Sequence, residues 1–197
     1  MPVDHWFPTS IYWNDLDLDR DSLLATIDSL PTARPEPWLH KCDTSYFIDR
    51  MLHHRPEMDA FCRAITLEMQ AYSRELGADL DTHVILIKDM WFNRYHRGDA
   101  QEFHIHAGSH LSGVYYLQAD EGAAVTAFEN PLTDREMLPM PVAGEFTIVR
   151  YEPVAGRVLL FRSWLRHMVG TQTTDAARTT ISWNAVLWPK DSLPRAG

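Results

Sequence analysis

The second half of the chain is dominated by short segments with the character of β-strands. Each segment is rich in β-branched and aromatic residues, which favour strands, and turn residues separate one segment from the next. Many short strands of this kind predict a β-sandwich or barrel. The segments span residues 82–95, 110–118, 123–130, 145–153, 156–161, 164–171 and 178–188.

The first half of the chain is predicted to contain the helices. Residues 56–76 carry apolar side chains at spacings of three and four, with a proline at the first position and Gly77 after the last, which is typical of a helix with one buried face. Residues 19–30 predict a shorter amphipathic helix, and residues 6–13 predict an aromatic-rich strand. The proline-rich segment 31–50 predicts a loop that could cover a site.

Length and pattern together predict one domain. A chain of 197 residues can bury one substantial core and has no obvious surplus for a second. We therefore expect a single domain over residues 1–197, with a helical part at about 15–77 and a β core at about 80–190. The expected fold class is mainly β with α, because helices precede one set of strands and no internal repeat divides the chain.

Charge and cysteine usage limit the partners and the compartment. A net charge of −9 at pH 7 works against nucleic-acid binding, which requires clustered Lys and Arg. Two cysteines without a CxxC pair fit a reducing compartment and disfavour a thiolate metal site. No apolar run approaches the roughly 20 residues of a membrane span, and the first residues lack the pattern of a signal peptide. We expect a cytoplasmic protein without nucleic-acid or membrane partners.

Three histidines in the β-rich half have an order that favours a metal site. His104 and His106 are two residues apart in an extended segment, so their side chains point the same way and can bind one ion together. Such a pair also occurs among ordinary surface histidines. His167 follows a hydrophobic strand and a short connection, which could return a third imidazole to the same mouth of a barrel. Arg178 then begins the last strand, with Thr180 on the same side.

Four sequence blocks, together with Arg178, carry a resemblance to a known family. The chain resembles the 2-oxoglutarate- and Fe(II)-dependent oxygenases, and looks most like a small bacterial and phage branch of them. The likeness extends from about Trp91 to Trp188, and Tyr95-His96-Arg97-Gly98 is similar to the YxxG that precedes HxD in prolyl-hydroxylase-type relatives. The blocks are Trp91-Phe92-Asn93, His104-Ile105-His106, SHLSGVYY from Ser109 to Tyr116, and FRSWLRH from Phe161 to His167.

The resemblance implies a fold, a cofactor and a reaction. The implied fold is a double-stranded β-helix, or jelly roll, with helices packed outside. The implied metal is Fe(II), with 2-oxoglutarate and O2 as co-substrates, and the implied enzyme is a dioxygenase that hydroxylates an amino acid, another small metabolite or a peptide side chain. His104, His106 and His167 would be the metal ligands, and Arg178 would bind the far carboxylate of 2-oxoglutarate.

Residues beside Arg178 are expected to contribute further contacts to the co-substrate. The resemblance gives Tyr95 a hydrogen bond to 2-oxoglutarate. Thr180 shares the side of Arg178 by strand alternation, and Asn93 shares the side of Tyr95. The alternatives are a threonine that merely favours a strand, an asparagine that caps one, and an arginine in a surface salt bridge.

The third metal ligand is the main departure from the wider family, in which a carboxylate stands at the position of His106. Glu102 or Asp99 could supply that carboxylate instead, but Glu102 has the correct side only if the strand stays regular there. Strand alternation favours His106. His110 is expected near the metal or at the substrate mouth. Tyr115, Tyr116, Trp164 and Trp183 are expected in the core or in pocket walls.

Departures within the matching blocks are expected where substrate specificity is set. Arg162 stands where the branch has a proline, and residues 129–132 replace a DPR-like block. Two other functions remain open: a cupin-like three-histidine dioxygenase that does not use 2-oxoglutarate, and a jelly roll without catalytic activity that binds a ligand or a metal. The partner is expected to be a small molecule or a peptide, and a homodimer is left open.

Overall fold

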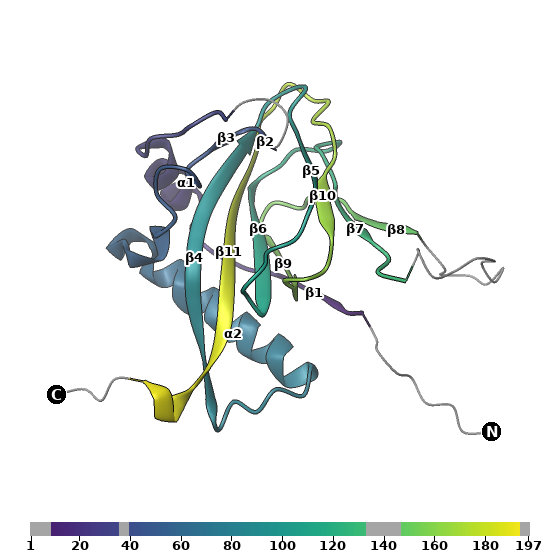
Figure 1. Cartoon of the computed structure of the whole chain (residues 1–197). Helices are drawn as coiled ribbons and strands as arrows, with labels where there is room; N and C mark the ends of the chain where they lie inside the picture. The colour runs from purple at the N-terminus through teal and green to yellow at the C-terminus, as the bar shows by residue number, and fades with distance from the viewer. Residues whose placement is uncertain (1–8, 36–39, 133–146, 194–197) are drawn as a thin grey trace.

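Two antiparallel β-sheets form the body of the molecule in the computed structural model, which describes residues 9–35, 40–132 and 147–193. The six-stranded sheet has the order β1-β9-β6-β11-β4-β3, and the five-stranded sheet has the order β2-β5-β10-β7-β8. Figure 1 shows the long strands β4 and β11 at the centre, with the five-stranded sheet to their right. The strands are β1 (Ile11–Asp15), β2 (His40–Lys41), β3 (Asp43–Thr44), β4 (His83–Tyr95), β5 (Ala100–His104), β6 (Leu111–Gln118), β7 (Thr126–Glu129), β8 (Ile148–Tyr151), β9 (Arg157–Arg162), β10 (His167–Val169) and β11 (Arg178–Pro189).

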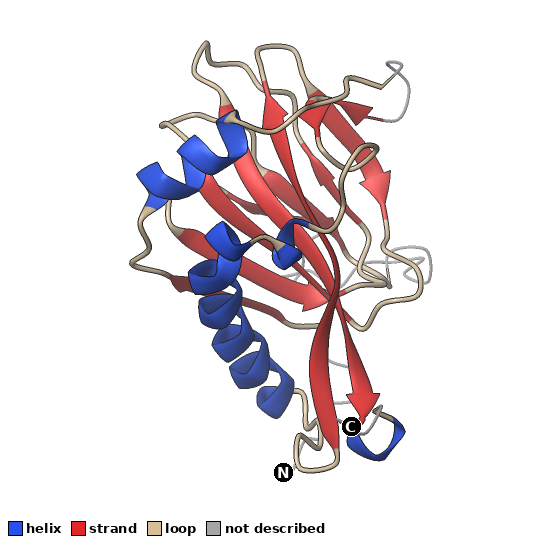
Figure 2. Cartoon of the chain, turned by 90° about the vertical axis from the view of Figure 1, so that its left-hand side faces the viewer, coloured by secondary structure: helices blue, strands red, loops and turns tan. Residues whose placement is uncertain are grey.

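The helices cover one face of the six-stranded sheet (Figure 2). This arrangement confirms the expected class, a mainly β jelly roll with helices outside. No helix among the described residues is long and apolar enough to span a membrane. The helices are α1 (Arg20–Asp28) and α2 (Asp59–Glu75), with the 3-10 turns η1 (Leu52–His54), η2 (Pro56–Met58) and η4 (Lys190–Ser192).

Both predicted helices are confirmed with small shifts at their ends. The Asp19 side chain caps α1 by accepting from the Ser22 backbone N–H at 3.0 Å. The predicted helix at 56–76 begins as the 3-10 turn η2 and continues as α2. The apolar stripe of α2 is buried against the sheet, and the Phe61 ring lies edge-on to Tyr115 and Trp183 at centroid distances of 5.3 and 5.7 Å.

The predicted strands of the second half are confirmed where the structure describes them. Strands β4, β6, β7, β9, β10 and β11 fall within or almost within the predicted segments. The segments 6–13 and 145–153 are described only from residues 9 and 147 onward. Strand β1 begins within the first segment and continues to Asp15, and β8 lies within the second. Strands β2 and β3 are two residues each, and neither has a clear signal in the sequence.

Gly113 lies directly against the indole of Trp183 in the neighbouring strand. The two residues are paired across β6 and β11. A Cβ atom at position 113 would lie 2.2 Å from the Trp183 ring, a distance no folded structure tolerates without movement. Close packing of this indole over β6 therefore explains why a glycine stands at this position.

We expect Gly113→Ala to lower the free energy of unfolding by about 1–3 kcal/mol, because the added methyl overpacks the core and displaces Trp183. Urea denaturation followed by tryptophan fluorescence measures this loss. Gly170→Ala is the matched control, since the nearest atom to a Cβ there, in Val125, is 3.5 Å away. Equal stability of the two variants would contradict the packing role of Gly113.

Candidate metal centre

Strand pairing brings the three predicted histidines together. His104 ends β5 and lies directly opposite His167, which begins β10. His106 follows β5, and its backbone N–H donates to the Ser163 carbonyl at 2.9 Å. Each of the three imidazole rings offers one nitrogen as a possible metal ligand, and these three nitrogens lie within 4.8 Å of one another. This cluster contains no carboxylate or thiolate among the described residues.

Backbone carbonyls orient two of the imidazoles for metal binding. Nδ1 of His104 lies 2.8 Å from the Glu102 carbonyl, and Nδ1 of His167 lies 2.9 Å from the Leu165 carbonyl. A carbonyl oxygen only accepts, so each Nδ1 carries the proton and each Nε2 presents a lone pair. This is the arrangement in which a backbone oxygen fixes the tautomer of a metal-binding histidine.

The separation of the Nε2 atoms fits a shared ion. Nε2 of His106 and Nε2 of His167 are 3.2 Å apart. Two imidazole ligands about 2.1 Å from one ion, at right angles to each other, have nitrogens about 3 Å apart. Burial and the neighbouring histidines His104 and His106 lower the pKa of His167 well below its usual range. His167 is therefore neutral, which is the protonation state a metal ligand requires.

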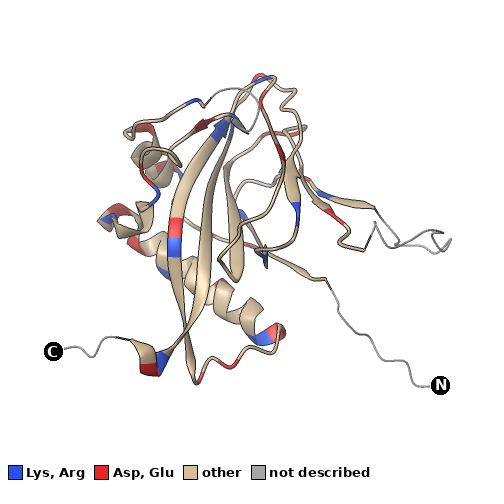
Figure 3. Cartoon of the chain, viewed as in Figure 1, with Lys and Arg blue, Asp and Glu red and all other residues tan. Residues whose placement is uncertain are grey.

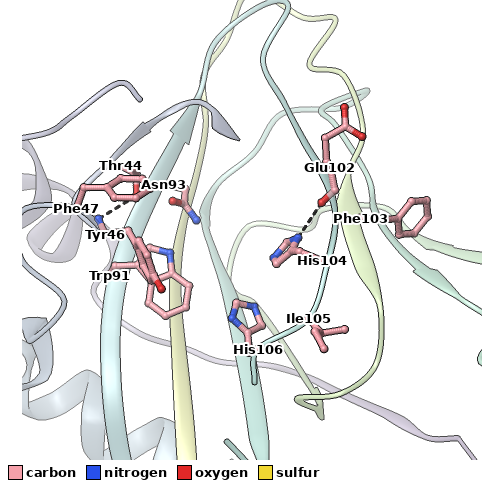
Figure 4. Close-up of a pocket in the computed structure, with 10 residues that line it drawn as sticks. All are labelled: Thr44, Tyr46, Phe47, Trp91, Asn93, Glu102, Phe103, His104, Ile105 and His106. Atoms are coloured by element: carbon pink, nitrogen blue, oxygen red, sulfur yellow. Dashed lines mark hydrogen bonds between the residues drawn. The ribbon is translucent and has the colours of Figure 1, made fainter. Parts of the chain in front are cut away.

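The alternative carboxylate ligands lie outside the cluster. The Glu102 side chain is exposed, and Figure 4 shows its carboxylate directed away from His104 and His106. Asp99 accepts two hydrogen bonds of 2.9 Å from the Arg34 guanidinium and one from the His96 backbone N–H. Both carboxylates are therefore unavailable in this arrangement, and His106 takes the third place in the cluster.

Arg178 is buried in the same cavity as the histidines and has no charged partner among the described residues. It is 1% exposed, and Figure 3 shows the acidic and basic residues spread over the helices, the turns and several strands. Its Nη2 donates to the Thr126 hydroxyl at 2.9 Å, and its guanidinium lies about 5 Å from the ring centroids of Tyr95 and Tyr116. Nε and Nη1 have no hydrogen-bond partner among the described residues. A buried guanidinium with unpaired donors is costly, so this wall is suited to an anion.

Tyr95, Asn93 and Thr180 line the cavity beside Arg178. Arg178 pairs with Tyr95, and Thr180 pairs with Asn93, across β11 and β4. Burial raises the pKa of Tyr95 well above its usual range, so its hydroxyl remains a donor. With its amide oriented to suit its neighbours, Asn93 donates to the Thr44 hydroxyl at 2.7 Å and accepts from the Trp91 indole at 3.2 Å.

Gln101 connects the two halves of the site and was missed from the sequence. Its carbonyl oxygen accepts from the Tyr95 hydroxyl at 2.7 Å. Its amide nitrogen lies 3.3 Å from Nε2 of His104, the atom that would bind a metal. Regular alternation would put Gln101 and His104 on opposite faces of β5, and the register shift between β5 and β10 brings them together. The sequence carries no signal of this contact.

Two adjoining cavities share Trp91, Asn93, His104 and His106. The inner cavity, about 30 Å³, extends from the histidines to Arg178 and Thr180. The outer cavity, about 200 Å³, opens between the histidines and the segment that contains Tyr46 and Phe47 (Figure 4). That segment belongs to the proline-rich region 31–50, which therefore covers a site as expected, although residues 36–39 lie outside the described ranges.

Three expectations about the surroundings of the site were wrong. His110 and Arg162 line a separate cavity on the helix side of the six-stranded sheet, with Ser73 and Leu76. Arg162 is on this side because it shares the parity of Leu160, which packs in the core beneath the helices. Trp164 is 46% exposed rather than part of the core or a pocket wall. Tyr115 and Trp183 are in the core, as expected, and Tyr116 packs between the sheets.

The matching family accounts for the order of these residues. The model of the family described as "Putative 2OG-Fe(II) oxygenase" matches residues 89–184, which include the three histidines and Arg178. The match covers 96 of the 197 residues, and over this stretch the chain is similar to the family. A family of this description implies Fe(II) as the metal and 2-oxoglutarate as co-substrate. Among curated proteins, no sequence matches the chain.

Solved structures of related enzymes share the fold. A prolyl-4-hydroxylase from Pseudomonas putida is 17% identical, with a TM-score of 0.61 over 90% of this chain and 93% of that one. The epimerase SnoN, in complex with Fe3+, alpha ketoglutarate and nogalamycin RO, is 15% identical, with a TM-score of 0.64 over 96% and 87%. The collagen prolyl hydroxylase of Paramecium Bursaria Chlorella virus-1 is 12% identical, with a TM-score of 0.59 over 89% and 96%. Because these sequence identities are low, the similarity to the three structures shows a shared fold and no more.

We expect His104→Ala and His167→Ala to weaken binding of Fe(II) by about 100-fold or more, because loss of a ligand costs at least as much as loss of a group that orients one. Anaerobic equilibrium dialysis with metal analysis measures the affinity. His83→Ala is the matched control, since His83 lies at the far end of β4. Unchanged affinity in the His104 and His167 variants would place the metal elsewhere.

Proposed function

We propose that the protein is an Fe(II)- and 2-oxoglutarate-dependent dioxygenase that hydroxylates an amino acid, another small metabolite or a peptide side chain. The observation that carries the proposal is the buried Arg178, whose two unpaired nitrogens share one cavity with three clustered imidazoles. A metal that binds one end of a dicarboxylate and a guanidinium that binds the other end explain both features.

In this proposal His104, His106 and His167 hold the metal through their Nε2 atoms. Three neutral imidazoles leave the full charge of the ion uncompensated, whereas the more usual carboxylate ligand would cancel part of it. The site would therefore carry more positive charge, which would favour binding of an anionic co-substrate beside the three histidines. When bound, Fe(II) and 2-oxoglutarate together supply O2 activation, with 2-oxoglutarate converted to succinate and CO2 as the substrate C–H bond is oxidised.

Arg178 then orients the co-substrate by binding its far carboxylate. Tyr95 and Thr180 present hydroxyl groups on the same wall, and we propose that they complete the contacts with that carboxylate. Asn93 lines both cavities, and its amide is already hydrogen-bonded to Thr44 and Trp91. We therefore propose that Asn93 contacts one side of the co-substrate and helps to position it, without binding either carboxylate. Burial of the whole wall excludes water from the reacting groups.

Gln101 has to move when the site is loaded. Its amide lies 3.3 Å from the His104 lone pair that a metal would use, and a volume of about 30 Å³ holds about one water molecule. Rotation of Gln101 away from His104 would free the metal-binding nitrogen and enlarge the inner cavity in one step. The Tyr95 hydroxyl would lose its present acceptor and become available to the co-substrate.

A cupin-like dioxygenase that does not use 2-oxoglutarate is the second candidate. The three-histidine cluster, without a carboxylate among the described residues, favours it. Such an enzyme does not require an anion site beside the metal, so it leaves the buried donors of Arg178 unexplained. Binding of 2-oxoglutarate therefore separates the two candidates.

We expect anaerobic addition of 2-oxoglutarate to the Fe(II)-loaded protein to produce the visible charge-transfer band of chelated iron. In Arg178→Ala the affinity for 2-oxoglutarate should fall by about 100-fold, because a charge-assisted pair contributes roughly 2–3 kcal/mol. Arg178→Lys should recover part of it, since one charge returns without the planar donor set. Spectrophotometric titration measures both affinities.

Arg97→Ala is the control for this experiment, because Arg97 forms an exposed ion pair with Asp175. Its titration should match that of the unmodified protein. Iron binding without a band and without 2-oxoglutarate affinity would reject the proposed function and favour the cupin-like candidate.

A further inference from the structure

Aromatic side chains form one wall of the outer cavity. The Tyr46 ring lies edge-on to Phe47 and Trp91, at centroid distances of 5.2 and 5.1 Å. Figure 4 shows these rings on one side of the cavity and the imidazoles of His104 and His106 on the other. A substrate that reaches the metal from outside therefore passes along an aromatic surface.

The outer cavity offers no uncommitted charge among the described residues. Its only carboxylate, in Glu102, is directed away from the histidines (Figure 4). The Thr44 hydroxyl donates to the Phe92 carbonyl at 3.0 Å and accepts from the Tyr46 backbone N–H at 3.1 Å. The amide of Asn93 is held as described above. None of the described lining residues is therefore set to bind the ammonium or the carboxylate of a free amino acid. The guanidinium of Arg50 lies near the wall, but Arg50 is exposed and is not among the lining residues, so solvent screens its charge.

A cation is further disfavoured by the surroundings of Tyr46. The Arg50 guanidinium already lies over the Tyr46 ring, 5.0 Å from its centroid. This positive charge stands beside the aromatic wall, and a metal ion held by the histidines would add another on the opposite side. An aromatic wall can attract cations, but two nearby positive charges work against that attraction.

The cavity is small and its apolar surface continues outside it. A volume of about 200 Å³ is below the range of roughly 300–1,000 Å³ typical of sites that enclose a whole small molecule. Phe47 and Ile105 line the cavity, yet they are 54% and 52% exposed, so they also present apolar surface at its rim. Large exposed apolar side chains around a concavity mark a surface for binding.

We propose that the outer cavity receives an uncharged apolar group, aromatic or aliphatic, that is carried by a larger substrate. The inserted group lies against Tyr46 and Trp91 and faces the histidine cluster, while the rest of the substrate remains outside, over Phe47 and Ile105. This assignment rests on the proposed function for the reaction, and it narrows the substrate class by excluding free zwitterionic amino acids.

Two probes with the same side chain test the assignment. N-acetyl-L-phenylalaninamide is uncharged at its ends, whereas L-phenylalanine is a zwitterion. Saturation-transfer NMR titrations measure both, on the protein without metal and on the protein loaded with Zn(II) and 2-oxoglutarate. We expect the blocked amide to bind at least about tenfold more tightly in both states, because burying a charge without a partner is costly.

A pair of variants locates the binding. Phe47→Glu places a carboxylate at the rim and should weaken binding of the blocked amide by about tenfold. Leu67→Glu is the matched control, since Leu67 is 65% exposed on α2, and it should leave the affinity unchanged. Neither residue belongs to the proposed metal or co-substrate site, so both variants should keep the Fe(II) and 2-oxoglutarate band.

Several results would overturn the assignment: equal or tighter binding of L-phenylalanine, tighter binding of benzyltrimethylammonium, or no binding of the blocked amide. If the band forms while the probes fail, only the substrate inference is wrong. If the probes bind as expected while no band forms, the proposed function is wrong, but the outer cavity still binds an uncharged apolar group.

Discussion

Antiparallel pairing in one fixed register is the constraint on which the candidate site depends. His167 lies opposite His104 across β10 and β5, and Arg178 lies opposite Tyr95 across β11 and β4. Because side chains alternate along a strand, a slip of one residue in either pair would turn these groups to the other face of the sheet. The buried aromatic residues that stabilise this register therefore also keep the residues of the candidate site in position.

One face of the six-stranded sheet packs in the hydrophobic core, and the other face carries residues of the candidate site. Along β11, Ile181, Trp183 and Ala185 pack in the core beneath the helices, whereas Thr180 and Ser182 line the inner cavity. Gly113 allows the Trp183 indole to lie flat against β6, which fixes β11 relative to its neighbour. Apolar packing on one face thus stabilises the polar, less favourable arrangement on the other.

That polar arrangement carries a cost that a ligand can offset. Arg178 is buried beside two tyrosine rings with two unpaired nitrogens, and three imidazoles converge within 4.8 Å. The guanidinium is costly without an anion because its charge and two of its donors are buried without a partner. The imidazoles are unfavourable without a cation because their lone pairs converge on one point. Gln101 partly satisfies the site in its present form by linking Tyr95 to His104. Loading would replace these provisional contacts with stronger ones.

The sequence by itself determined the class of fold, the two helices, most of the strands and the resemblance to the oxygenase family. These depend on local periodicity and on blocks of residues that keep their order, such as His104-Ile105-His106 before His167 and Arg178. Alternation alone did not separate Glu102 from His106, because both share the parity of His104. The register of β5 against β10 is irregular at this point, and the Glu102 carboxylate is directed away from the cluster.

Only the tertiary structure decided which residues meet. The Gln101 contact, the aromatic wall of Tyr46 and Phe47, and the position of Arg162 and His110 behind the sheet all depend on how distant segments pack. Trp164 was misplaced for the same reason, since its exposure depends on the turn between β9 and β10 rather than on its hydrophobicity. Alternation assigns a side chain to one of two faces, but packing between sheets and helices decides what each face contacts.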